Sequence, residues 1–195
     1  MDQPLGRAVG NALELRESLD SLEGQGPEDL ITLVCALAAE MLHAAGMVTD
    51  RAEGHQRALN TLNDGSAMTT FRAMVKAQGG DLSVLDDPTQ IVQAERQTQV
   101  QVPDGGVITG FDCLAVGRVA MSLGAGRAKA GDPIDHGVGV VLHAKRGDTL
   151  RAGDVLATLH HRADQDPTGP SEALLKAVCV GDRMGDAQPL IIERL

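Results

Sequence analysis

Apolar residues recur every three or four positions through the first part of the chain, which predicts a succession of helices. In the first helix Ala12 and Leu19 share one face. Pro27 opens the second, at a position where proline removes no helical hydrogen bond. Thr49 and Ser66 are expected to cap the third and fourth. The predicted helices cover residues 11–23, 27–46, 49–63 and 66–79.

After residue 88 the pattern changes to short runs of alternating or β-branched residues, which predict strands. Turns rich in Gly and Asp separate these runs, as at Gly147-Asp148 and Gly153-Asp154. Short strands joined by such tight turns are typical of a small sandwich with a thin aliphatic layer. The predicted strands are residues 98–102, 107–111, 138–143, 149–151, 155–160 and 190–192.

Two further helices interrupt the strands. One is predicted over residues 114–123, and the other begins after Pro170, with Ser171 as its cap, and stops at Gly181. The change of pattern predicts two domains, residues 1–88 and residues 89–195. The fold class is therefore expected to be α+β, with a helical segment followed by a domain of strands and helices.

Composition and charge narrow the classes of partner. Phe71 and Phe111 are the only aromatic residues apart from histidines, so stacking of bases on aromatic platforms is excluded. The formal net charge is −10, and an acidic surface repels both nucleic acid and anionic lipid. No apolar run approaches the roughly 20 residues that span a bilayer, and the first residues do not have the pattern of a signal peptide. We expect no nucleic-acid partner and no membrane.

The cysteines indicate the redox compartment. Cys35, Cys113 and Cys179 are odd in number, far apart and in no CxxC pair, which argues against disulfides and zinc. Each is surrounded by apolar residues in the sequence, so we expect all three to be small buried side chains. Free thiols of this kind indicate a reducing cytoplasm.

Several motifs suggest chemistry but have simpler explanations. The segment Leu123–Lys129 (LGAGRAK) exposes glycine amides beside basic residues, yet it follows a helix and lacks phosphate-loop spacing, so a helix-ending turn is the better interpretation. The neighbouring His160 and His161 point to opposite faces of a strand, which disfavours one shared metal ion. Asp132 and Asp135 flank Pro133 and are better explained as turn caps than as a catalytic pair.

Three stretches, in this order and spacing, resemble thymidine and pyrimidine-nucleoside phosphorylases. The first is QPLGRAVGNALE at residues 3–14, and the second is MVKAQGGD at residues 74–81. The third runs from LGAGRAK through DPIDH to GDTL, within residues 123–150. The resemblance covers essentially the whole chain and corresponds to the carboxy-terminal part of the family.

This resemblance implies both a fold and a reaction. Residues 1–88 are expected to be a helical remnant of the family's α/β catalytic domain, and residues 89–195 its α/β-hammerhead, barrel-sandwich-like C-terminal domain. The reaction is that of a pentosyltransferase, in which phosphate as co-substrate displaces the base of a pyrimidine nucleoside, giving free base and pentose 1-phosphate. No organic cofactor is implied.

The resemblance also implies that the groups that bind phosphate and base belong to an amino-terminal part of the family. No Lys-His-Ser segment occurs here, so we expect no catalytic residue in this chain and no activity from it alone. Family members are homodimers whose contacts are mostly in that amino-terminal part. The alternative is a non-catalytic structural or interaction module with a biotinyl/lipoyl-like sandwich, although no predicted hairpin tip presents the lysine such carriers use.

The resemblance also implies part of a monovalent-cation site. Bacterial members bind a monovalent cation, taken to be K⁺, through backbone carbonyls and a helix glutamate. The matching positions are the carbonyls of Leu5 and Ala8 and the carboxylate of Glu17. Several neutral carbonyls balanced by one anion suit a weakly hydrated cation. We expect half of a potassium site, with little affinity by itself.

Overall fold

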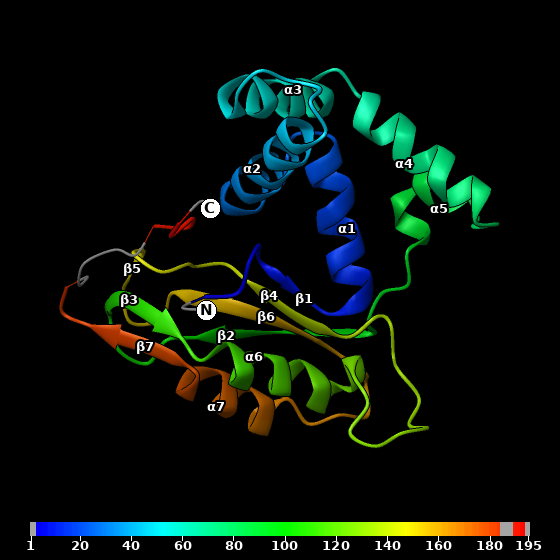
Figure 1. Ribbon diagram of the computed structural model, residues 1–195. Coiled ribbons are helices and arrows are strands. Elements are labelled where there is room, and N and C mark those ends of the chain that lie inside the picture. Colours follow the sequence, from blue (N-terminus) through cyan, green and yellow to red (C-terminus); the bar gives the residue numbers. More distant parts are fainter. Residues whose placement is uncertain (1–2, 184–188, 194–195) are drawn as a thin grey trace. The chain divides into compact units, whose positions relative to one another are not determined.

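The computed structural model describes residues 3–183 and 189–193 and divides the chain into two compact units (Figure 1). The first unit contains residues 1–15 and 91–187, and the second contains residues 16–90 and 188–195. The break near residue 90 lies close to the predicted division after residue 88. However, the first 15 residues belong with the later part of the chain and not with the helices that follow them.

The second unit consists of helices. Its elements are the greater part of α1 (Asn11–Leu22), then α2 (Glu28–Ala44), α3 (Arg51–Asn63), α4 (Ser66–Ala77), α5 (Ser83–Asp86) and a short 3₁₀ helix, η1 (Pro88–Gln90). The buried core of this unit includes Cys35 of α2 and Ala58 and Leu62 of α3. At Gly54 the two helices approach so closely that a Cβ would lie 3.0 Å from the Cα of Ala39.

The four predicted helices are all present, but two of their predicted caps are wrong. The cap of α3 is Asp50, whose carboxylate accepts from the amide of Glu53, while Thr49 donates to the carboxylate of Glu53. Glycine at position 65, with φ of 77°, precedes α4, and Ser66 is already inside the helix. In both places a neighbouring Asp satisfies the free amide groups, since Asp64 accepts from Ser66.

In its described residues the first unit contains two small antiparallel sheets, the start of α1 and further helical segments. One sheet has the order β1-β4-β6-β2, from β1 (Ala8–Val9), β4 (Gly139–Leu142), β6 (Val155–His161) and β2 (Arg96–Gln101). The other has the order β5-β3-β7, from β5 (Thr149–Leu150), β3 (Gly106–Phe111) and β7 (Val178–Gly181). Together with the helices, these sheets confirm the predicted α+β class.

The helices α6 (Cys113–Ala120) and α7 (Thr168–Lys176) lie side by side (Figure 1). A π-helical turn, η2 (Met121–Ala125), continues α6. One aliphatic cluster joins both sheets and both helices, and its fully buried members are Ile108, Val116, Leu123, Val138, Val140, Leu142, Leu156, Leu159 and Leu174. Leu, Val and Ile fill this core because the chain has almost no aromatic side chains.

Several predicted elements differ from the observed ones. The predicted helix ending at Gly181 is two elements, because α7 stops at Lys176 and residues 178–181 form β7 along β3. Residues 190–192 form no strand. The cysteine prediction holds for buried Cys35, while Cys113 is half-buried and Cys179 is exposed on β7, so the prediction was wrong there. Within the described residues, no helix has the length and apolar content that crossing a bilayer requires.

Candidate functional site

The predicted potassium ligands are divided between the two units. Leu5 and Ala8 belong to the first unit, whereas Glu17 lies on α1 within the second. Leu5 is 36% exposed, and no hydrogen bond involves it in the part of the chain that the structure describes. Two of the three predicted ligands, the carbonyls of Leu5 and Ala8, thus lie on one segment of the chain. The potassium site itself stays a prediction.

The geometry of β1 suits a carbonyl ligand at Ala8. In the β1–β4 ladder Ala8 pairs with Val141, and the neighbouring Leu142 donates its amide to the carbonyl of Arg7, 2.9 Å away. Hydrogen-bonded and non-hydrogen-bonded pairs alternate along an antiparallel ladder, so the Ala8–Val141 pair is of the second kind. Its carbonyl therefore points away from β4.

The segment that carries these carbonyls is bound to the strand end and turn at residues 142–146. The guanidinium of Arg7 donates to the carbonyl of His143, 2.9 Å away, and the amide of Arg146 donates to the side-chain oxygen of Gln3, 3.0 Å away. The ammonium of Lys145 donates to two backbone carbonyls, that of Pro4 at 2.5 Å and that of Gly6. A basic residue from far along the chain thus holds the Pro-Leu-Gly turn.

His143 has a second contact that fixes its ring. Its Nε2 lies 2.7 Å from Oγ1 of the buried Thr158 on β6. Partial burial of the ring, and next the neighbouring Arg7 guanidinium, lower the pKa of His143 below its ordinary value. Both causes disfavour the charged form of the ring.

The LGAGRAK segment is the end of a helix, as predicted. Its Gly124 has φ of 108°, and the helical turns end at Ala125. The following loop closes on Asp132, whose carbonyl accepts from Nε of Arg127 and whose carboxylate accepts from the amide of Lys129. Asp135 likewise caps Gly137. Both acids cap backbone amides of the turn, as the turn-cap interpretation predicted.

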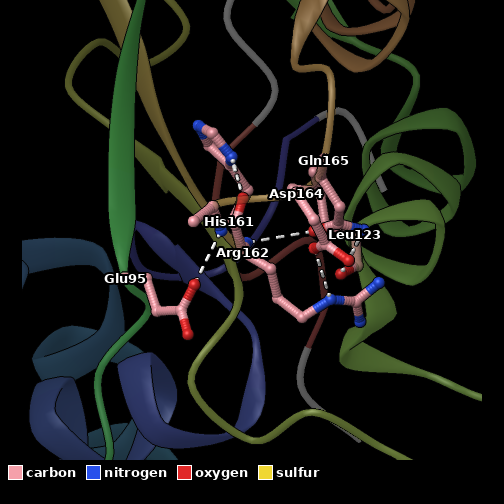
Figure 2. A network of polar contacts seen from close by, with 7 residues as sticks. Glu95, Leu123, His161, Arg162, Asp164 and Gln165 are labelled. Carbon is pink, nitrogen blue, oxygen red and sulfur yellow. Dashed lines mark hydrogen bonds and ion pairs between the residues drawn. The ribbon is translucent and has the colours of Figure 1, made fainter.

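Beside this loop lies an open pocket of about 450 Å³, lined by residues that include Gly124, Asp135, His136 and Arg162. Figure 2 shows Arg162 directed toward Asp164, and the Nε–Oδ1 distance is 3.2 Å. Gln165 links the same loop to η2 by donating to the carbonyl of Leu123, and Glu95 accepts from the amide of residue 163. The guanidinium is thus already paired and is not a ready anion site.

The histidines do not form a metal centre. His161 is buried and bonds to Thr98, whereas His160 points to the other face of β6. Among residues 3–183 and 189–193, no three His, Cys, Asp or Glu side chains come together as a metal site would require.

Sequence reasoning missed the role of Lys145, because it placed this residue only at a turn. Its two acceptors, on Pro4 and Gly6, are 141 and 139 residues away along the chain. No local pattern reports such a contact. The one sequence signal is the pairing of a Pro-Leu-Gly turn with a lysine two residues before a Gly-Asp pair, and it gains meaning only with the β1–β4 ladder in place.

Comparison with known proteins adds the deciding observation. A family model described as "Pyrimidine nucleoside phosphorylase C-terminal domain" matches residues 107–178. A pyrimidine-nucleoside phosphorylase of Staphylococcus aureus (strain USA300) is 37% identical over 195 residues, which is 100% of this chain and 44% of the relative. The chain corresponds to the carboxy-terminal portion of the pyrimidine-nucleoside phosphorylase family.

A second relative of the same description comes from Geobacillus stearothermophilus. This pyrimidine-nucleoside phosphorylase is 41% identical over 165 residues, which is 85% of this chain and 38% of the relative. The chain therefore spans less than half the length of the curated pyrimidine-nucleoside phosphorylases it matches.

Proposed function

We propose that this chain is the carboxy-terminal portion of an enzyme that catalyses phosphorolysis of pyrimidine nucleosides. A phosphate oxygen would bond to the anomeric carbon while the glycosidic C–N bond breaks. The pyrimidine would leave with the electron pair and take up a proton. The observation that carries this proposal is the match of all 195 residues to a pyrimidine-nucleoside phosphorylase at 37% identity.

We propose further that this chain supplies no catalytic residue. The reaction requires cationic or hydrogen-bonding groups for phosphate and for the departing base. Arg162, which lines the open pocket, is already paired with Asp164, and Arg127 of the neighbouring loop already donates to the Asp132 carbonyl. The family resemblance assigns the reacting groups to the part of the relatives that this chain does not match.

The role of the chain would then be to supply scaffolding and part of a cation site. Carbonyls of Leu5 and Ala8 and the carboxylate of Glu17 would hold K⁺, and further ligands would come from the rest of the enzyme. The exposure of Leu5 and the direction of the Ala8 carbonyl, away from β4, support the carbonyl ligands. Cys35, Cys113 and Cys179 are not joined by disulfides, which fits a reducing cytoplasm as the place of action.

The alternative of a biotinyl or lipoyl carrier has an observation against it. A carrier lysine must present its amine to solvent on a mobile arm, whereas the ammonium of Lys145 is bound to the carbonyls of Pro4 and Gly6. A purely structural or interaction module remains the competing class, and activity of the complete enzyme distinguishes the two.

The first experiment is an assay of the purified chain with thymidine or uridine and phosphate, following free base by absorbance. We expect no release of base and no heat of phosphate binding in calorimetry. Release of thymine or uracil by the chain alone would show that it contains catalytic groups, and the proposed division of labour would be wrong.

A further inference from the structure

Two carbonyls of the Pro4–Gly6 turn form a small cation site in the first unit. Both accept from the ammonium of Lys145, that of Pro4 at 2.5 Å. Hydrogen bonds from an ionised donor are shorter and roughly twice as strong as neutral ones. Carbonyl oxygens arranged around a monovalent cation are also the way in which proteins replace its hydration shell.

The lysine is fixed at its backbone as well as at its ammonium. Its amide donates to the carboxylate of Asp148, 2.8 Å away, and its carbonyl accepts from the Asp148 amide, 3.1 Å away. Gly147, with φ of 96°, makes this turn possible. The half-buried side chain thus reaches the Pro4–Gly6 turn from an ordered backbone.

The ammonium fixes the two peptide groups that flank the Leu5–Gly6 peptide bond. The Pro4 carbonyl belongs to the peptide bond before Leu5, and the Gly6 carbonyl belongs to the bond after Gly6. Gly6 has φ of 67°, which turns its carbonyl without a steric penalty. Because both flanking peptide planes are held, the plane that carries the Leu5 carbonyl is restrained as well.

We propose that Lys145 is a tethered cation for the Pro4–Gly6 turn. It orders residues 3–9 and presents the Leu5 and Ala8 carbonyls without a bound metal ion. Residues 3–9 would then be ordered before potassium binds. A potassium ion on the Leu5 and Ala8 carbonyls would only join this segment to other polypeptide. The ammonium site stands on the hydrogen bonds alone, and only its relation to potassium rests on the proposed function.

The test measures amide hydrogen exchange of residues 5–9, in potassium chloride and in choline chloride at equal ionic strength. The wild-type chain is expected to exchange at the same rate in both salts. Lys145→Met is expected to exchange about tenfold faster or more, because a hydrogen bond to a charged group is lost. Lys145→Arg should keep most of the protection.

Chemical rescue makes the test specific for a cation. Ammonium or potassium ions, but not choline, should restore part of the protection in Lys145→Met. Lys129→Met is the matched control, since it removes an exposed lysine whose hydrogen bonds to Asp132 come from its backbone, and its exchange should equal that of the wild type. Equal exchange in Lys145→Met and wild type overturns the proposal, as does wild-type protection that appears only in potassium chloride.

A measurement on the wild-type chain covers the case in which Lys145→Met fails to fold. Trace labelling with acetic anhydride compares the reactivity of individual lysine amines. Lys145 should react about tenfold more slowly than Lys129, because its ammonium is held by two acceptors. Equal rates overturn the proposal. None of these measurements involves a nucleoside, so a failure of the proposed phosphorolysis would leave their outcome unchanged.

Discussion

The Oγ1 atom of Thr98 lies 2.9 Å from Nε2 of His161, across the register of β2 and β6. The other ring nitrogen, Nδ1, lies 2.8 Å from the carbonyl of Arg162. A carbonyl oxygen only accepts, so Nδ1 must carry a proton. In the neutral ring Nε2 is then the acceptor, and the hydroxyl of Thr98 donates to it. Both nitrogens of a ring that is only 5% exposed are thereby satisfied.

Replacing Thr98 by Val should therefore destabilise the first unit. The change keeps the shape of the side chain but leaves a buried ring nitrogen without its donor, which costs about 1–3 kcal/mol. Urea unfolding measures the difference. Thr109→Val is the control, because its hydroxyl makes an exposed hydrogen bond to the carbonyl of Cys179 on another strand pair. If the two substitutions lower the free energy of unfolding equally, the Thr98–His161 hydrogen bond stabilises the unit no more than an exposed one does.

The close pairing of β1 with β4 depends on a glycine. At Gly139, which has φ of 154°, an added Cβ would lie 2.3 Å from the carbonyl oxygen of Val9. Gly139→Ala should lower the free energy of unfolding by about 2–3 kcal/mol or more, through backbone strain and the clash together.

A second glycine separates these two causes. Gly153 has φ of 87° and no atom within 4 Å of an added Cβ, so Gly153→Ala tests the strain without the clash. Its expected cost is about 1 kcal/mol. If the two substitutions destabilise equally, the close approach of β1 to β4 does not contribute.

The lowered pKa of His143 predicts a pH dependence. The unfolded chain has the ordinary value of about 6.5, so below that pH the unfolded state binds more protons than the folded state. The contribution of His143 to stability is complete above about pH 6.5 and decreases as the pH falls toward the lower, folded value.

NMR titration of the His143 ring measures this directly. The pKa should lie below about 6.5 in the wild type and rise in Arg7→Met, because the nearby positive charge is removed. Arg57→Met, which changes an arginine of the second unit, should leave it unchanged. An ordinary pKa in the wild type would contradict this account of the segment.

The apolar face of α2 predicts self-association of the isolated chain. Val34, Leu37 and Met41 are 47%, 54% and 69% exposed and lie on one side of the helix. Such a patch is expected to associate with other copies. Sedimentation should show a concentration-dependent species, and the double change Leu37→Glu and Met41→Lys should abolish it.

A single exposed leucine provides the control for that experiment. Leu114 on α6 is 65% exposed, and Leu114→Glu should leave the association unchanged. A wild-type chain that stays monomeric at all concentrations would show that the α2 face does not drive association.

The long helices and most strands of the first unit could be predicted because their periodicity is local. The strands β1 and β7 could not. β1 is only Ala8–Val9, too short to show alternation, and it exists through its pairing with β4. The run at residues 178–181 continues an apolar helical pattern, but its pairing with β3 decides its structure.

The candidate site was predictable only in part. The positions of Leu5, Ala8 and Glu17 came from a family resemblance carried by sequence motifs, and they stay predictions. The contacts of Lys145 with Pro4 and Gly6, and of Arg7 with His143, join segments more than a hundred residues apart. Such contacts follow from the tertiary pairing of β1 with β4 and leave no periodic signal in the sequence.

The central claim is that this chain is the carboxy-terminal portion of a phosphorolytic enzyme whose reacting groups lie elsewhere. The most direct measurement joins the chain, in one polypeptide, to the part of the Staphylococcus aureus relative that it does not match. Phosphate-dependent release of free base from thymidine or uridine is then assayed beside the unaltered relative. We predict release by the joined protein and none by the chain alone. A joined protein that folds and shows no activity, while the relative is active, would contradict the claim.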